Sequence, residues 1–275
     1  MSLLEAIVLG VVQGLTEFLP ISSTGHLRIV PAFAGWDDPG AAFTAVVQLG
    51  TTVAVVWYFR HDLWAVARAW LASVARRETR PRQLEARLGW YLVVATVPIS
   101  LFGFAFQHQI ETGARSLYLI GSALIVFSAV MLAAERLGAR ERGLGSVGLR
   151  DALAVGFAQA LALVPGVSRS GATISAGLLV GLERAAAARF SFLLSIPAIV
   201  LSGLFELHKL VNGTATTRAG ALAIAVATVS AFVFGYASIA FLLRYLQTHS
   251  LGAFIVYRVA LGAVVLVLVA AGVIS

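Results

Sequence analysis

Two short segments of the chain hold most of the side chains that could do chemistry together. Residues 13–26 read QGLTEFLPISSTGH, and residues 165–173 read PGVSRSGAT. The first segment offers a carboxylate, hydroxyls and a histidine, and the second offers an arginine among glycines and hydroxyls. Arginine, glycine, serine and a following helix N-terminus are suited to binding phosphate. A hydroxyl beside a base is suited to attacking phosphorus, so the two segments together indicate phosphoryl transfer.

The first segment is expected to break a helix at a polar tip. Gln13 and Glu17 are four residues apart and share one face of a helix, which Pro20 then ends. A hydroxyl within residues 22–24 can cap a second helix that carries His26. In an apolar chain, such a break is tolerated only where it is buried in protein or faces a wet cavity.

The order of the side chains in this tip suggests a nucleophile and its base. Ser23 is the favoured nucleophile, with His26 three residues later as the base. The same spacing allows His26 to attack phosphorus directly, and it also fits a buried histidine with only a structural role.

The second segment is expected to hold the anion. Arg169 lies in a loop at membrane depth, where an arginine costs about 3 kcal/mol, so its partner should be an anion. Gly166 and Gly171 allow the backbone to approach a ligand closely. The alternative is that Arg169 only pairs with Glu17 to hold two hairpins together. The hydroxyls expected to bind phosphate are those of Ser168, Ser170 and Thr173.

The composition is that of a multi-spanning membrane protein. Of 275 residues, 59% are hydrophobic and only 12% are charged, and the mean hydropathy is +0.91. The absence of cysteine excludes disulfides, thiol nucleophiles and cysteine-bound metals. The net charge of +7 is carried almost wholly by arginine, mostly in two short loops. This placement favours a role in membrane orientation over nucleic-acid binding.

Six apolar stretches are long enough to span a membrane, and two shorter ones are not. The shorter stretches, 4–19 and 151–164, each end at a proline-containing polar tip and lead into a second short segment, 22–34 or 170–182. Such pairs are typical of re-entrant hairpins. The six predicted spans are 41–59, 88–107, 116–134, 187–207, 219–243 and 251–273.

The two halves of the chain correspond to each other. A shift of 146 residues aligns Glu5 with Asp151 and Gln13 with Gln159, and it aligns the two polar tips. The resulting repeats cover about 1–135 and 150–275 within a single transmembrane domain, 1–275. Glu5 and Asp151, early in each hairpin, are expected to cap helices or face headgroups. Chance similarity between two stretches rich in Gly, Ala and Leu is the alternative.

The distribution of arginine predicts how the repeats are oriented. Loop 60–87 holds seven arginines and loop 135–150 holds four, so both are expected on the cytoplasmic side. The first hairpin then enters from outside and the second from the cytoplasm. The fold class is therefore an all-α integral membrane protein with six transmembrane helices and two re-entrant hairpins in an inverted-topology repeat.

Two polar residues inside the predicted spans have open roles. Gln48, in VVQLGTT of the first full span, could approach the polar tips. Arg258 lies within the last apolar span and could either face the cavity or pair with the other half.

Both tips resemble the signature regions of the undecaprenyl-diphosphate phosphatase family, the bacitracin-resistance proteins of bacteria. The first signature is (E/Q)xxxE followed by PxSSTGH, and the second is PGxSRSGxT; residues 13–26 and 165–173 meet both in full. Gln13 occupies the first position of (E/Q)xxxE, which is either Glu or Gln in the family. Glu17 is therefore the only charged residue of this pair. The number and spacing of the spans also fit the family along the whole chain.

The resemblance implies an enzyme that removes the terminal phosphate of a C55 polyprenyl diphosphate, helped by Mg²⁺ or Ca²⁺. Arg169 would hold the diphosphate, and Glu17, with Gln13 in support, would bind the metal or transfer a proton. Ser23 and His26 would be the candidates for nucleophile and base, and Ser22 would help to bind phosphate. The resemblance also implies a multi-pass protein of the bacterial inner membrane with its active site on the periplasmic side. Its expected partners are the lipid substrate and membrane lipids, with a homodimer as a further hypothesis.

A transporter or lipid flippase is the competing function, because inverted repeats with broken helices are common in secondary transporters. A nucleophile beside Arg169 favours the enzyme, since transport alone needs no nucleophile. A purely structural scaffold would leave Glu17 and Arg169 at membrane depth without a reason.

Overall fold

The computed structural model shows a helical membrane protein. In the part of the chain that it describes there is no strand, only one isolated bridge between Arg142 and Leu182. Five helices are long and apolar enough to cross a membrane, and α3 together with α4 makes a sixth if the bent pair is one span. The prediction of an all-α, multi-pass protein is therefore confirmed. The described residues are 1–76, 83–106, 116–211 and 219–274.

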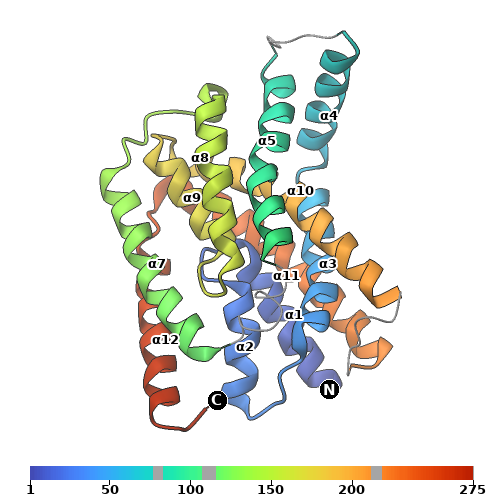
Figure 1. Cartoon of the computed structure of the whole chain (residues 1–275), viewed down its shortest axis with the longest axis vertical. Helices are drawn as coiled ribbons and strands as arrows, with labels where there is room; N and C mark the ends of the chain where they lie inside the picture. Colours follow the sequence, from blue (N-terminus) through green and yellow to red (C-terminus); the bar gives the residue numbers. More distant parts are fainter. Residues whose placement is uncertain (77–82, 107–115, 212–218, 275) are drawn as a thin grey trace.

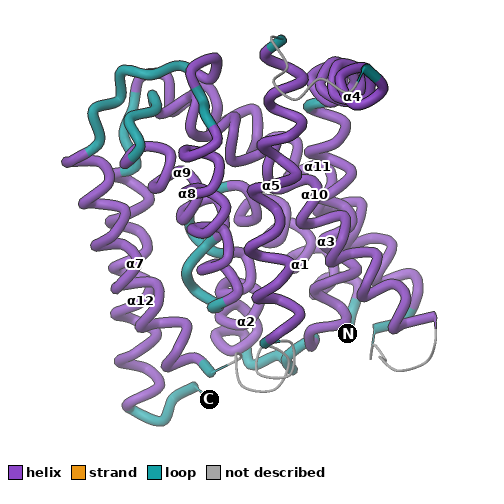
Figure 2. Tube along the Cα trace, turned by 45° about the horizontal axis from the view of Figure 1, so that its top comes forward, coloured by secondary structure: helices purple, strands orange, loops and turns teal. Residues whose placement is uncertain are grey.

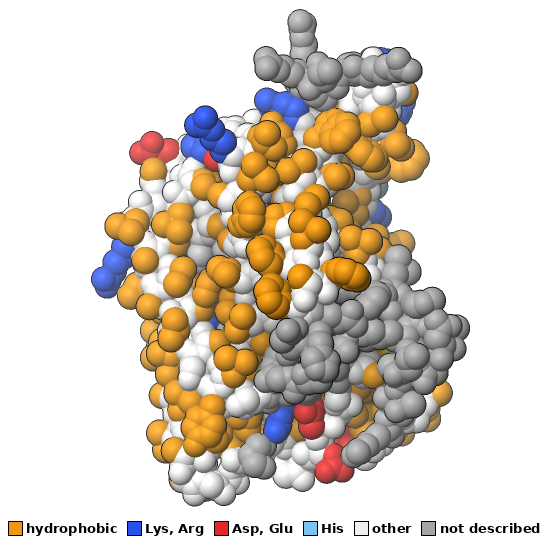
Figure 3. All heavy atoms as spheres, viewed as in Figure 1, with side chains coloured by type: hydrophobic (Ala, Val, Ile, Leu, Met, Phe, Trp, Pro, Cys, Tyr) orange, Lys and Arg blue, Asp and Glu red, His pale blue; other side chains and the backbone are white. Residues whose placement is uncertain are grey.

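The long helices lie where the apolar stretches predict them. Hydrophobic side chains cover the flank of the molecule in Figure 3, while charged side chains gather mostly toward its two ends. This distribution matches a chain whose sides face lipid and whose ends face water. The long helices are α3 (Gly40–Tyr58), α5 (Leu84–Ala105), α7 (Leu117–Leu137), α10 (Arg184–Val211), α11 (Ala221–Thr248) and α12 (Gly252–Ala270).

The connection after α3 differs from the loop expected over 60–87. It forms helix α4 (Arg60–Ala75), which bends away from α3 by 73° and packs on α5. Val66, Trp70 and Ser73 recur at helical spacing on its inner face, and the rings of Trp70 and Trp90 meet edge to face at 5.5 Å. The arginines of this segment were interpreted as a sign of a cytoplasmic loop. Arginine is also a good helix former, so its presence did not exclude a helix. The loop's other part, residues 77–82, lies outside the described residues.

Two pairs of short helices form hairpins that enter the molecule from opposite ends (Figures 1 and 2). The first pair is α1 (Leu3–Phe18) and α2 (Ser23–Ala34), which begins at the end where both termini lie. The second pair is α8 (Leu149–Ala160), followed by η2 (Leu161–Leu163), and α9 (Arg169–Leu179). Their polar tips lie inside the helical bundle.

Each hairpin packs against a long helix from the other half of the chain. Helix α1 packs on α11, and α8 packs on α5. Gly10 and Gly156, which are 146 residues apart, lie at these contacts, where a Cβ would come within 2.3 Å of the Ala227 oxygen and 2.5 Å of the Ala95 oxygen. Neither close approach would be open to a larger residue, so the two glycines set how closely each hairpin packs on its long helix.

The acidic residues early in each hairpin cap their helices, as predicted. The Glu5 carboxylate accepts from the Ser2 amide at 3.0 Å, and the Asp151 carboxylate accepts from the Gly148 amide at 2.9 Å. Asp151 also binds Arg142 at 2.6 Å. Burial opposes ionisation of Asp151, but the hydrogen bonds from Arg142 and Gly148 outweigh it and hold the pKa of this carboxyl below its usual value.

The Glu135 carboxylate ties three long helices together at the end of the molecule that holds α4 and the chain between α7 and α8, called the arginine-rich end below. Glu135, near the end of α7, is mostly buried and accepts from Arg184 of α10 at 2.8 Å. It also accepts from the backbone amide of Leu251, just before α12, at 2.8 Å. Helices α7, α10 and α12 are thus joined at this end, away from the two tips. The short turn η1 (Leu144–Ser146) lies in the same region, between α7 and α8.

Candidate active site

Glu17, near the C-terminal end of α1, joins the two tips. One carboxylate oxygen accepts from Ser23 Oγ at 2.5 Å and from Gln13 Nε2 at 3.0 Å. The other accepts from the Arg169 guanidinium and from Gln48 Nε2 at 3.5 Å. Glu17 is only 8% exposed, so its negative charge is stabilised by these four donors rather than by bulk water. The helical spacing of Gln13 and Glu17 predicted that they share a face, and the approach of Gln48 is confirmed.

The two tips are built alike. Ser22 and Ser168 both have a positive φ, 74° and 75°, and each is the N-cap of the helix that follows. Ser22 Oγ accepts from the Gly25 amide at 3.4 Å, and Ser168 Oγ accepts from the Gly171 amide at 3.2 Å. The serines are 146 residues apart, and the two tips share this local backbone geometry.

The tips also contact each other directly. The Gly166 amide donates to Ser22 Oγ at 3.2 Å, and Ser170 Oγ donates to the Leu19 carbonyl at 3.1 Å. Together with the ion pair between Glu17 and Arg169, these bonds join residues more than 140 positions apart into one cluster. Residues 13–26 therefore do not form the site alone.

Thr173 lies deeper than the other hydroxyls of the second tip. It is fully buried one turn into α9, and its Oγ1 is 2.5 Å from Ser191 Oγ of α10 and 2.8 Å from the Arg169 carbonyl. The structure thus places Thr173 under Arg169, where it anchors α9 to α10. Its phosphate-binding role stays a prediction, as do those of Ser168 and Ser170, whose hydroxyls lie 3.1 Å apart.

His26 has partners other than the expected one. Its Nδ1 is 2.8 Å from the Ser22 carbonyl, and its Nε2 is 2.7 Å from the Tyr257 hydroxyl of α12. A carbonyl only accepts, so Nδ1 carries the proton and Nε2 of the neutral ring accepts from Tyr257. Both nitrogens are occupied and Ser23 donates to Glu17, so the geometry described here pairs Ser23 with Glu17 rather than with His26.

Two residues of α12 complete the surroundings of the tips. Tyr257 stacks on the His26 ring with centroids 5.6 Å apart, and the fully buried Arg258 donates to the Gly166 carbonyl at 2.8 Å. The sequence marked Arg258 only as a charge within an apolar span. Nothing in the sequence indicated that Tyr257 would contact His26, because tyrosines are common in membrane helices.

The oxygen atoms near Glu17 are those that a hard divalent cation prefers. Gln13 Oε1 is buried and has no hydrogen-bond partner within the described structure, although Gln13 Nε2 bonds Glu17. An orphaned acceptor beside a carboxylate fits a cation that takes its remaining ligands from phosphate and water. Within the described part of the chain, no three aspartate, glutamate, histidine or cysteine side chains cluster as a metal site would need.

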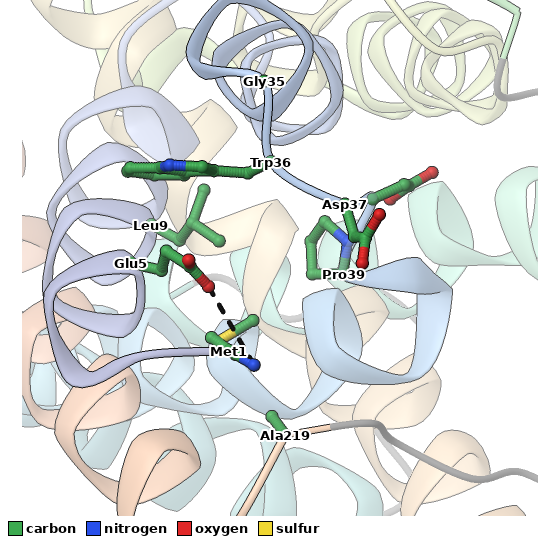
Figure 4. A pocket seen from close by; sticks show the side chains of 9 residues that line it. Met1, Glu5, Leu9, Gly35, Trp36, Asp37, Pro39 and Ala219 are labelled. Atoms are coloured by element: carbon green, nitrogen blue, oxygen red, sulfur yellow. Dashed lines mark ion pairs between the residues drawn. The ribbon is translucent and has the colours of Figure 1, made fainter.

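The cavity drawn in Figure 4 is separate from this cluster. It has a volume of about 300 Å³ and lies between the start of α1 and the chain after α2. The Met1 amino group faces the Glu5 carboxylate there at 4.0 Å, and Asp37 lies across the cavity from them. None of the nine residues drawn is a site residue predicted from the sequence.

Comparison with known proteins gives full-length matches. The family described as bacitracin resistance protein BacA matches residues 6–264. A protein of a Nocardioides species, named undecaprenyl-diphosphatase, is 55% identical over 99% of this chain and 98% of its own length. Proteins of the same name from Myxococcus xanthus and Chlorobaculum parvum are 52% and 49% identical, over 100% and 99% of this chain and 92% and 99% of theirs.

Proposed function

This chain belongs to the family of bacitracin resistance proteins, and we propose that it is an undecaprenyl-diphosphatase. It removes the terminal phosphate of undecaprenyl diphosphate and leaves undecaprenyl phosphate, the lipid carrier of cell-wall precursors. The proposal is supported by relatives of that name that match over nearly the whole chain at about half identity. This activity also explains bacitracin resistance, the property for which the family is named.

The ion pair and hydrogen bond that Glu17 makes with Arg169 and Ser23 carry the proposal. An arginine, a carboxylate and a hydroxyl brought from two distant segments are the parts that a phosphoryl transfer needs. Arg169 binds the diphosphate oxygens when substrate replaces its bond to Glu17. The N-termini of α2 and α9, which follow the two tips, add backbone N–H groups that favour an anion.

The reaction that this geometry favours begins at Ser23. Its Oγ attacks the terminal phosphorus and gives its proton to Glu17, which already accepts that hydrogen bond at 2.5 Å. The new O–P bond forms as the bond to the bridging oxygen breaks, and undecaprenyl phosphate leaves. Water then hydrolyses the phosphoserine and releases inorganic phosphate. Attack by His26 itself is the alternative, and it requires the ring to leave Tyr257.

A divalent cation, Mg²⁺ or Ca²⁺, belongs to this proposal. Glu17 and Gln13 would hold it, and the unpartnered Gln13 Oε1 supports that assignment. When bound, the cation supplies charge neutralisation on the phosphate oxygens. The protein's own part is to hold these two oxygen donors one helical turn apart on the buried face of α1.

The arrangement in the membrane is also part of the proposal. Hairpins α1/α2 and α8/α9 are re-entrant and belong to inverted repeats over 1–135 and 150–275, which the matching serine caps support. The arginine-rich end faces the cytoplasm, and the site opens to the periplasmic side of the inner membrane. Association into a homodimer stays a prediction.

Release of inorganic phosphate from undecaprenyl diphosphate by the purified protein tests the function. We expect phosphate release that requires Mg²⁺ or Ca²⁺ and stops in excess chelator. Movement of the lipid across a vesicle membrane without phosphate release would instead identify a flippase. Release that is unaffected by the chelator would remove the cation from the account and leave the hydrolysis in place.

A further inference from the structure

Arg258, in the first half of α12, is a fully buried cation held by neutral groups. Its Nε donates to Ser128 Oγ of α7 at 3.2 Å. The guanidinium also donates to two main-chain carbonyls in the tips, Pro20 at 3.3 Å and Gly166 at 2.8 Å. Among the described residues, the ion pairs include no carboxylate partner for Arg258. Burying such a charge is unfavourable unless the geometry of these bonds is itself required.

The two carbonyls come from different halves of the chain. Pro20 lies in the tip between α1 and α2, three residues from both Glu17 and Ser23. Gly166 lies in the tip between η2 and α9, three residues before Arg169. One planar guanidinium thus connects the segment that carries the nucleophile and base with the segment that carries the anion holder.

The backbone of Gly166 is hydrogen-bonded at both its amide and its carbonyl. Its amide donates to Ser22 Oγ of the opposite tip, and its carbonyl accepts from Arg258. Its φ of +96° favours glycine, and a Cβ there would lie 2.7 Å from the Ile120 oxygen of α7. The second tip is therefore held against the first tip and against α7 and α12, which lie side by side in Figure 1.

We propose that Arg258 is a positioning residue that sets the spacing of the two tips, and through it the approach of Ser23 to a diphosphate held by Arg169. This inference rests on the proposed phosphatase function. The side chain acts through the main chain of both tips and does not itself touch the transferred phosphate. A lysine keeps the charge, but it cannot reproduce the rigid fork that reaches both carbonyls.

Kinetics of Arg258→Gln and Arg258→Lys give the first test. Displacement of a reacting group by about 1 Å costs roughly 100-fold, so we expect kcat of Arg258→Gln to fall by about that factor. KM should change much less, because Arg169 still binds the diphosphate. The kcat of Arg258→Lys should lie between that of Arg258→Gln and that of the unaltered protein. Arg258→Lys serves as the test variant if Arg258→Gln does not fold. Arg184→Gln is the matched control, an arginine that bonds Glu135 away from the tips.

The spacing of the tips can be measured without activity. The chain has no cysteine, so nitroxide labels at Thr24→Cys and Val164→Cys report one distance between two exposed tip positions. Pulsed electron-resonance spectra should show a broadened or shifted distance in Arg258→Gln, a smaller change in Arg258→Lys and none in Arg184→Gln. An unchanged distance in both Arg258 variants overturns the proposal, and so does unchanged kcat. This distance does not depend on whether undecaprenyl diphosphate is the substrate, so it separates failure of the positioning role from failure of the function.

Discussion

At the scale of single residues, the chemistry centres on Glu17. Its two oxygens accept from Ser23, Gln13, Gln48 and Arg169, which come from α1, α2, α3 and the second tip. A carboxylate with this many donors is held in one orientation until substrate arrives. Phosphate oxygens that take the Arg169 guanidinium would remove the cation from one Glu17 oxygen, and the other oxygen, which already accepts from Ser23, would then be the better acceptor of its proton.

The bond between Ser23 and Glu17 predicts which residue carries the phosphoryl group. Enzyme that is quenched in detergent during turnover of substrate labelled in the terminal phosphate should retain label that survives acid, as a phosphoserine does. That label should be absent from Ser23→Ala. Label that is lost in acid, and that persists in Ser23→Ala, would contradict this assignment and identify His26 as the nucleophile.

The residue pattern predicted which side chains gather, but not how they pair. The polar side chains of the two tips contact each other as expected, because an apolar bundle offers them few other polar partners. These side chains are Gln13, Glu17, Ser22, Ser23, Arg169 and Ser170. The pairing of Ser23 was expected to involve His26, because they are three residues apart. The rings of His26 and Tyr257 lie together instead, through a contact 231 residues apart in sequence that no local pattern contains.

At the scale of elements, the tip of the second hairpin depends on one peptide. Gly166 has a positive φ and lies against the α7 backbone, so Gly166→Ala introduces both strain and a clash. We expect this variant to lose about 1–3 kcal/mol of stability from the backbone strain alone, seen as a lower Tm. The activity of the folded fraction should also fall, because the carbonyl that binds Arg258 moves.

Gly143→Ala is the control for this substitution, since Gly143 has a negative φ and no atom within 4 Å of an added Cβ. Its Tm and activity should match those of the unaltered protein. Equal effects of the two substitutions would show that the tip is not specially constrained.

Most elements follow from composition, proline and caps, but α4 does not. The apolar stretches predicted the long helices, and the prolines and serines predicted the helix breaks at the two tips. Helix α4 was expected as loop, because its arginines were read only as an orientation signal. Its inner face, Val66, Trp70 and Ser73, is too short and too mixed to stand out before the α5 surface that it covers is known.

At the scale of the whole molecule, each half completes the other. Helix α1 of the first half packs on α11 of the second, and α8 of the second packs on α5 of the first. The site therefore exists only when both halves are folded together. Sequence repeats can indicate such an arrangement, but the contacts between the halves depend on packing that is spread over the entire chain.

The proposed orientation can be checked from either side of the membrane. The chain has no cysteine, so single cysteines can be introduced at Asp37, which lies close to Met1, and at Gly143, which caps η1 between α7 and α8 at the arginine-rich end. A membrane-impermeant thiol reagent added to intact spheroplasts should label the Asp37→Cys protein only. Lysed spheroplasts control for reactivity by labelling both. The reverse pattern in intact spheroplasts would contradict an outward-facing site.

The central claim is that the two tips form one catalytic unit. A double-mutant cycle on kcat/KM for phosphate release from undecaprenyl diphosphate, with Ser23→Ala, Arg169→Ala and both together, tests it most directly. Each single change is expected to cost about 10³-fold or more, and the double variant should lose little beyond the worse single, because residues that act as a unit are not additive. Two losses that simply multiply would contradict the claim, as would activity that survives either single change.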